Sequence, residues 1–127
     1  MGKTAAVLGA SRHRHKFGNK SLRAHLEAGF EAFAVNPNSE EGEIEGARVL
    51  SRLAEVPGPV HRVTVYLPPA VTLELLEEIS QAAPKEVWLN PGSHDRAVLT
   101  RARELGLPIR EGCSIVDLGM SPSQFPH

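Results

Sequence analysis

Short apolar runs alternate with amphipathic segments along the chain. The first run, residues 4–9, has the length of a strand buried on both faces and ends at a glycine. After a polar, basic stretch, residues 19–28 place Leu22 and Leu26 at helical spacing, and Gly29 provides a C-terminal stop. The chain therefore begins with a predicted strand, a loop and a helix, in that order.

The same pattern recurs down the chain. Further strands are predicted at residues 30–35, 62–67, 86–89 and 107–110. Helical stripes follow the third and fourth strands, formed by Leu75, Ile79 and Ala82 and then by Val98, Ala102 and Leu105. Proline-containing turns end three of these strands, because proline cannot donate to a sheet ladder.

Strands that alternate with helices indicate an α/β fold. We expect three layers, with a mainly parallel sheet of about five strands and helices on both faces. Residues 38–60 do not fit the alternation: residues 39–46 are acidic and contain glycine, and residues 51–55 form at most one helical turn. A chain of 127 residues fits one domain, which we place at residues 1–120, with an irregular tail at residues 121–127.

Composition restricts the compartment and the partners. A net charge of −1 gives no general attraction to nucleic acid or to anionic membranes. The single cysteine, Cys113, excludes an internal disulfide and a multi-cysteine metal site. No apolar run approaches the roughly 20 residues of a membrane helix, and no signal-peptide pattern stands at the start. We expect a cytoplasmic protein with a small-molecule nucleotide ligand. The sequence leaves open whether it forms a homo-oligomer or pairs with a separately encoded subunit.

The loop after the first strand carries the candidate site. In open parallel sheets, ligands bind beyond the carboxyl ends of the strands, where the helix N-terminus favours an anion. Gly9 permits a tight turn, Ser11 offers a hydroxyl, and Arg12, Arg14 and Lys16 add positive charge. This pattern predicts a phosphate cradle, with a solvated basic loop as the alternative reading.

Nicotinamide dinucleotides are the first ligands to consider. The glycine-rich fingerprint G-x-G-x-x-G is absent, since Ser11 and Arg14 stand at the second and third glycine positions. The second strand ends in Asn36 where an acidic residue would hold the ribose of NAD. A phosphorylated ribose favours basic side chains instead, which leaves NADP or coenzyme A (CoA). Tyr66 is followed by Ala70 four residues later, so the Tyr-x-x-x-Lys pair of short-chain dehydrogenases is missing.

Five short motifs at successive strand ends point to one family. They are Val7-Leu8-Gly9-Ala10-Ser11, Val35-Asn36-Pro37, Val65-Tyr66-Leu67-Pro68-Pro69-Ala70, Asn90-Pro91-Gly92 and Gly112-Cys113-Ser114. In these motifs, over about residues 4–114, the chain resembles the CoA-binding domain at the N-terminus of the succinyl-CoA synthetase α subunit and its small stand-alone relatives.

This resemblance implies a Rossmann-like fold and a set of binding residues. The phosphates would lie on the first loop, at Gly9, Ala10, Ser11, Arg12, His13, Arg14 and Lys16. The adenine, ribose and pantetheine would be flanked by Asn36, Pro37, Leu67, Pro68, Val71, Asn90 and Pro91. The synthetase's phosphorylated histidine belongs to a second domain that these residues do not contain, so we do not expect ligase activity.

We therefore predict a module that binds CoA or an acyl-CoA and has no catalytic residues of its own. The alternatives are an NADP-dependent oxidoreductase or nucleotide-sensing domain on the same fold, and an interaction domain with a vestigial site. We predict no metal site, because His13 and His15 stand among basic residues. Cys113 is either a thiol facing the CoA thiol or a small buried residue.

Overall fold

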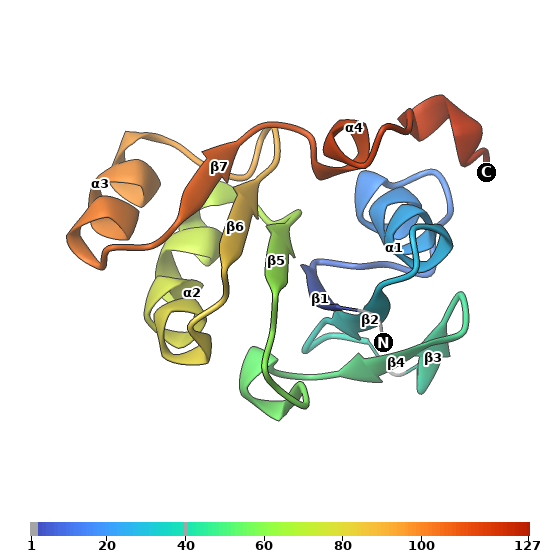
Figure 1. Cartoon of the computed structure of the whole chain (residues 1–127), viewed down its shortest axis with the longest axis horizontal. Helices are drawn as coiled ribbons and strands as arrows, with labels where there is room; N and C mark the ends of the chain where they lie inside the picture. Colours follow the sequence, from blue (N-terminus) through green and yellow to red (C-terminus); the bar gives the residue numbers. More distant parts are fainter. Residues whose placement is uncertain (1–2, 40) are drawn as a thin grey trace.

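The computed structural model describes residues 3–39 and 41–127, which form a sheet between two layers of helices (Figure 1). The strands are β1 (Thr4–Leu8), β2 (Glu31–Val35), β3 (Glu43–Ile44), β4 (Ala47–Leu50), β5 (Arg62–Val65), β6 (Glu86–Leu89) and β7 (Ile109–Glu111). The helices are α1 (Phe17–Glu27), α2 (Pro69–Ala82), α3 (Arg96–Glu104) and α4 (Ser114–Asp117), with 3-10 turns η1 (Leu53–Glu55) and η2 (Pro122–Gln124). Among these described elements, no helix has the length and apolar character needed to cross a membrane.

The sheet is parallel except at one edge. Among the described residues it has seven strands in the order β3-β4-β2-β1-β5-β6-β7, and only the β3–β4 pair is antiparallel. Figure 1 shows α1 and α4 on one side of the sheet and α2 and α3 on the other. The predicted three-layer α/β fold is confirmed, although the sheet exceeds the expected five strands.

The parallel strands end in register. Leu8, the last residue of β1, lies opposite Val35 of β2 and Val65 of β5, and Val65 lies opposite Leu89 of β6. From β1 the chain builds outward through β2 and β4, then returns past β1 to build β5, β6 and β7 on the other side. The strand order therefore reverses between β1 and β5, and the loops beyond this edge are where ligands bind in such sheets.

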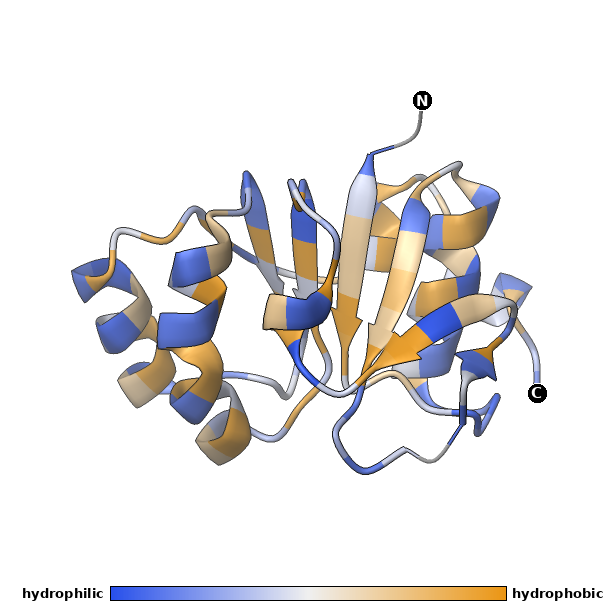
Figure 2. Ribbon diagram, turned by 90° about the horizontal axis from the view of Figure 1, so that it is seen from below, coloured by the Kyte–Doolittle hydropathy of each residue, from blue (hydrophilic) through white to orange (hydrophobic). Residues whose placement is uncertain are grey.

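Two apolar clusters hold the layers together. The larger cluster packs the strand residues Leu8, Val65 and Leu89 against Leu76 and Ile79 of α2. On the opposite face the strand residues under α1 are small. Leu22 of α1 packs with Val7, Ala32 and Ala34 there. Figure 2 shows the apolar residues concentrated along the strands and the inner faces of the helices, with polar residues outside.

Residues 38–60, which lack a clear pattern in the sequence, contain the two additional strands. Glu45 and Gly46 have φ values of 53° and 83°, so both occupy the left-handed region that a tight two-residue hairpin turn requires. This turn pairs β3 with β4, and β4 in turn pairs with β2. The single helical turn expected at residues 51–55 is present as η1.

The C-terminal residues pack against α1. Phe125 is buried, beside Ala24 and Ile115. The guanidinium of Arg23 donates to the carbonyl oxygens of Phe125 and Pro126, at 3.1 and 2.9 Å. Residues 121–127, expected as an irregular tail, therefore include the turn η2 and cover part of α1. The short helix α4 was not predicted from the sequence.

Candidate functional site

Two glycines set the first loop against the end of β1. Gly9 has φ 88°, and a Cβ there would stand 2.4 Å from the Tyr66 carbonyl oxygen. Gly18, in the first turn of α1, approaches Gly9 so closely that a Cβ on Gly18 would stand 2.6 Å from the Gly9 carbonyl oxygen. Only glycine fits at both positions, and the N-terminus of α1 is thereby held directly beside the carboxyl end of β1.

Three side chains, one from the loop after β2 and two from α1, fix the loop backbone. The Asn36 amide donates to the Ala10 carbonyl at 2.9 Å, and the Asn19 amide donates to the Ser11 carbonyl at 2.8 Å. Arg23 donates to the Arg14 carbonyl at 2.9 Å. Sequence reasoning missed Asn19 and Arg23, because their role depends on how α1 folds back along the loop that precedes it.

A cleft of about 1300 Å³ runs along the carboxyl ends of the parallel strands. We call it the carboxyl-edge cleft. Loops after β1, β2, β4, β5 and β6 line it, together with Cys113 before α4 and the first half of α2. Phe17 and Gly18, the first two residues of α1, also line it, so the N-terminus of that helix opens onto the cleft.

Most of the predicted binding residues line this cleft: Gly9, Ser11, Lys16, Asn36, Pro37, Leu67, Pro68, Val71, Asn90 and Pro91. Ala10, Arg12, His13 and Arg14 are not among the lining residues. Ala10 is buried in the cluster under α1. Residues from four separate loops therefore converge on one cavity, as the expected topology requires.

The two arginines of the first loop point toward acids of the β3–β4 region. Arg12 lies 3.9 Å from a carboxylate oxygen of Glu41, and Arg14 lies 3.2 Å from one of Glu45. Glu45 is the turn residue of the hairpin, and it also accepts from the Asn19 amide at 3.2 Å. The sequence did not predict this hairpin. It therefore did not show that Glu45 competes with a ligand phosphate for Arg14.

Asn36 and Asn90 line the cleft, yet their side chains are engaged inside the protein. The Asn36 amide oxygen accepts from the Asn38 backbone at 2.9 Å, while its nitrogen holds Ala10. The Asn90 nitrogen donates to Thr64 Oγ1 at 2.7 Å and to the Val65 carbonyl at 2.9 Å. Its oxygen accepts from the Ser114 amide at 2.9 Å. These two residues therefore shape the cleft wall by bracing neighbouring loops.

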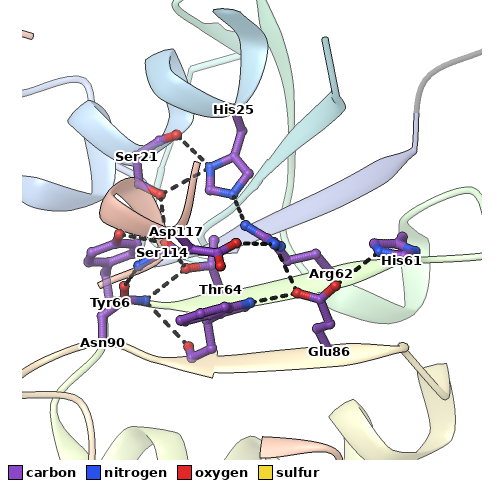
Figure 3. Close-up of polar contacts among 11 residues, drawn as sticks. Ser21, His25, His61, Arg62, Thr64, Tyr66, Glu86, Asn90, Ser114 and Asp117 are labelled. Carbon is purple, nitrogen blue, oxygen red and sulfur yellow. Dashed lines mark hydrogen bonds and ion pairs between the residues drawn. The ribbon is translucent and has the colours of Figure 1, made fainter. Parts of the chain in front are cut away.

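A polar cluster lies under α1 and α4, on the face of the sheet away from α2 (Figure 3). It contains Ser21, His25, Arg62, Thr64, Tyr66, Glu86, Asn90, Ser114 and Asp117. Tyr66 and Asn90 belong to the cluster and also line the carboxyl-edge cleft. The cluster therefore connects the cleft wall with the interior of the domain.

At the end of the polar cluster away from the cleft, Arg62 forms two ion pairs. Arg62 is almost fully buried and donates to Glu86 at 2.8 Å and to Asp117 at 2.6 Å. The rings of Phe30 and Trp88 also contact its guanidinium, with 5.3 and 5.2 Å to their centroids. The Asp117 contact ties α4, and with it the Cys113 end of the cleft, to the sheet.

Burial controls the protonation of the cluster. His25 is fully buried, and this loss of water lowers the pKa of its imidazole to about 4, with the Arg62 charge acting in the same direction. Burial also raises the pKa of the Tyr66 phenol. Burial by itself would raise the pKa of Glu86, but hydrogen bonds from Trp88 and Arg62 lower it below the usual value. At neutral pH the cluster therefore holds a neutral imidazole and a protonated phenol, together with the Glu86 carboxylate beside Arg62.

Several cleft residues were not singled out from the sequence, among them Phe17, which stands at the start of α1 with 59% of its surface exposed. Cys113, for which the sequence left open a thiol facing CoA or a small buried residue, is half-buried and lines the cleft. Arg52 follows β4 and pairs with Glu78 of α2 at 3.1 Å. Arg52 could have been found only by recognising β4 as a parallel strand whose following loop joins the same edge.

A family model identifies the family, and solved structures share the fold. The model of a family described as "CoA binding domain" matches residues 3–119. A conserved hypothetical protein from Pyrococcus furiosus is 31% identical, with 92% of this chain and 99% of that chain covered and a TM-score of 0.80. A structure from Thermus thermophilus is 28% identical, with coverage of 91% and 87% and a TM-score of 0.83. No curated protein matches the chain.

A larger synthetase shares the fold over part of its length. Acetyl-coenzyme A synthetase 1 of Ca. Korarchaeum cryptofilum, in complex with phosphate and ADP, is 23% identical with a TM-score of 0.71. The match covers 84% of this chain and 25% of the synthetase. At this identity the likeness establishes a common architecture and nothing about the ligand of this chain.

Proposed function

The chain belongs to the CoA-binding domain family, and on that premise we propose that it binds CoA or an acyl-CoA in the carboxyl-edge cleft. The observation that carries this proposal is the contact between Gly18 and Gly9. That contact brings the first turn of α1 to the mouth of the cleft, at the point where the strand order reverses. A helix N-terminus with free amides at such a point is suited to a diphosphate.

The middle of the cleft is the proposed diphosphate site. Lys16 immediately precedes α1 and lines the cleft, so its ammonium group adds a positive charge to the helix N-terminus. Ser11 also lines the cleft, although its hydroxyl accepts from the His13 amide at 3.1 Å. Arg12 and Arg14 reach this site only by exchanging their partners Glu41 and Glu45 for the ligand.

The end of the cleft next to β2 is the proposed adenosine site. Asn36 and Pro37 line it after β2, and the apolar residues Leu67, Pro68 and Val71 line the cleft after β5. NAD binding commonly uses a carboxylate at the end of this strand to hold the ribose hydroxyls. The Asn36 side chain carries no charge, and both of its polar atoms already have partners in the protein. This favours CoA over NAD.

The other end of the cleft, beyond β6, is the proposed pantetheine site. Asn90, Pro91 and Cys113 line it. We propose a binding role without catalysis, because the hydroxyls near this end serve the structure. Ser93 donates to the Asn90 carbonyl at 2.6 Å, and Tyr66 Oη lies 3.0 Å from Ser114 Oγ. The raised pKa of Tyr66 also makes its phenol a poor general base at neutral pH.

Calorimetric titration of the purified protein with CoA, acetyl-CoA, dephospho-CoA, NAD and NADP tests the proposal. We expect CoA or acetyl-CoA to bind more tightly than either nicotinamide dinucleotide. Tighter binding of NADP would instead support an NADP-dependent oxidoreductase or nucleotide sensor on the same fold. Absence of binding to all five ligands would leave an interaction domain with a vestigial site.

A further inference from the structure

One lysine and one arginine, Lys16 and Arg52, line the carboxyl-edge cleft within residues 3–39 and 41–127. They come from different parts of the sheet. Lys16 lies at the N-terminus of α1, after β1, whereas Arg52 lies beyond the end of β4. The cleft therefore has a second cationic side chain, paired with Glu78, that the diphosphate site does not use.

Arg52 lies on the adenosine side of the cleft. The Asn36 backbone amide donates to the Leu50 carbonyl at 2.9 Å, so the loops that follow β2 and β4 run side by side. In the sheet β4 is the second strand from β1, which corresponds to roughly 10 Å at the usual strand spacing of about 4.8 Å. A group bound near Arg52 thus lies beyond the ribose position, away from the N-terminus of α1.

Hydrogen bonds hold both the backbone and the side chain of Arg52 in place. Its backbone amide donates to Glu55 Oε1 at 2.9 Å, and its guanidinium donates to Glu78 Oε2 at 3.1 Å. Glu78 is the less exposed partner, since 17% of its side chain is accessible compared with 69% for Arg52. A guanidinium has five N–H donors, so the contact with Glu78 orients Arg52 and leaves donors open to the cleft.

We propose that Arg52 binds the 3′-phosphate of CoA and makes the site selective for 3′-phosphorylated over dephosphorylated CoA. This inference rests on the proposed function, because it assumes that the diphosphate lies at Lys16 and α1. The 3′-phosphate is separated from the diphosphate by the ribose, and Arg52 is the cation beyond the ribose position. A planar guanidinium also matches phosphate oxygens with paired hydrogen bonds.

Titrations of CoA and dephospho-CoA into the wild type, Arg52→Gln, Arg52→Lys and Arg48→Gln test this role. Arg48 is an exposed arginine of β4, the strand that precedes Arg52, and it does not line the cleft, so Arg48→Gln removes an equal charge elsewhere. We expect Arg52→Gln to weaken CoA about tenfold, as loss of one charge-assisted contact implies. Dephospho-CoA should change less than about twofold, and Arg52→Lys should retain part of the preference.

Three results would overturn the assignment. Equal weakening of both ligands in Arg52→Gln would place Arg52 at another part of the nucleotide, and no change in either would remove Arg52 from the site. The same loss of CoA affinity in Arg48→Gln would reduce the effect to general charge. If the wild type binds neither ligand, the proposed function itself is wrong. If the wild type binds CoA and Arg52→Gln binds it equally well, only the role of Arg52 is wrong.

Discussion

Gly18 lies so close to Gly9 that a Cβ on Gly18 would stand 2.6 Å from the Gly9 carbonyl oxygen. Alanine in place of a helical glycine ordinarily stabilises a helix by about 0.5–1 kcal/mol. Here we expect Gly18→Ala to reduce the free energy of unfolding by about 1–3 kcal/mol and to weaken CoA, because the helix must move away from β1. Urea unfolding and calorimetry measure both effects.

Gly42→Ala is the matched control for Gly18→Ala. Gly42 does not have a left-handed backbone, and a Cβ there would meet nothing within 4 Å. We expect Gly42→Ala to have the same free energy of unfolding and the same affinity for CoA as the wild type. If Gly18→Ala also behaves like the wild type, the close approach of α1 to β1 does not create the site.

Lys16 is expected to contribute charge to the diphosphate site. Lys16→Gln should weaken CoA and dephospho-CoA by the same factor, about fivefold, because both ligands carry the diphosphate. The salt dependence of CoA binding should fall as well, as one charge no longer takes part. Calorimetry at two salt concentrations measures this. Lys85→Gln, at an exposed position outside the cleft, should have no effect, and a loss restricted to CoA would contradict the placement of Lys16.

The buried imidazole of His25 should make stability depend on pH. Its pKa is lowered from 6.5 to about 4, so between these values the unfolded chain binds a proton that the folded protein does not. Stability is therefore complete above about pH 6.5 and is lost as the pH falls toward 4, by up to roughly 3 kcal/mol. We expect urea unfolding at pH 7.5 and pH 4.5 to show this loss.

Two variants isolate the contribution of His25. In His25→Gln the free energy of unfolding should differ less between the two pH values, because the titrating imidazole is gone. His127→Gln, at an exposed histidine, should keep the wild-type difference. An unchanged pH dependence in His25→Gln would mean that other groups cause it.

Asn90 joins β5, β6 and α4 through one side chain. Asn90→Ala removes the acceptor of the buried Ser114 amide and the donor to the Val65 carbonyl. We expect it to cost at least about 2 kcal/mol of unfolding free energy, since buried polar groups lose their partners. Thermal and urea unfolding test this, with the exposed Asn38→Ala as the control. A cost in Asn90→Ala no larger than in Asn38→Ala would show that α4 is held without Asn90.

The three-layer α/β architecture could be predicted from the sequence. Apolar runs such as residues 86–89 mark the buried parallel strands, and regular alternation with helices determines how they connect. The family was also identified correctly, because its motifs stand at strand ends, where local geometry restricts the choice of residue. The hairpin of β3 and β4 escaped prediction, since strands of two and four residues carry too little periodicity to be recognised.

The residues that line the cleft could be predicted only in part. Gly9, Asn36 and Asn90 lie together at the cleft, because the ends of parallel strands meet at one edge, and their role in binding stays a prediction. The sequence did not show that Arg14 lies beside Glu45, a contact created by the unforeseen hairpin. Arg52 was missed for the same reason, since its place in the cleft depends on β4 pairing with β2.

Backbone ¹H–¹⁵N spectra recorded during titration with CoA test most directly whether CoA binds in the carboxyl-edge cleft at the N-terminus of α1. We expect the largest shifts at the amides of Gly9, Ser11, Phe17 and Gly18, with smaller shifts at Asn36 and Asn90, and only weak changes with NAD. Saturating shifts confined to the face of the sheet covered by α1 and α4, or no saturating shifts with CoA, would contradict the proposed site.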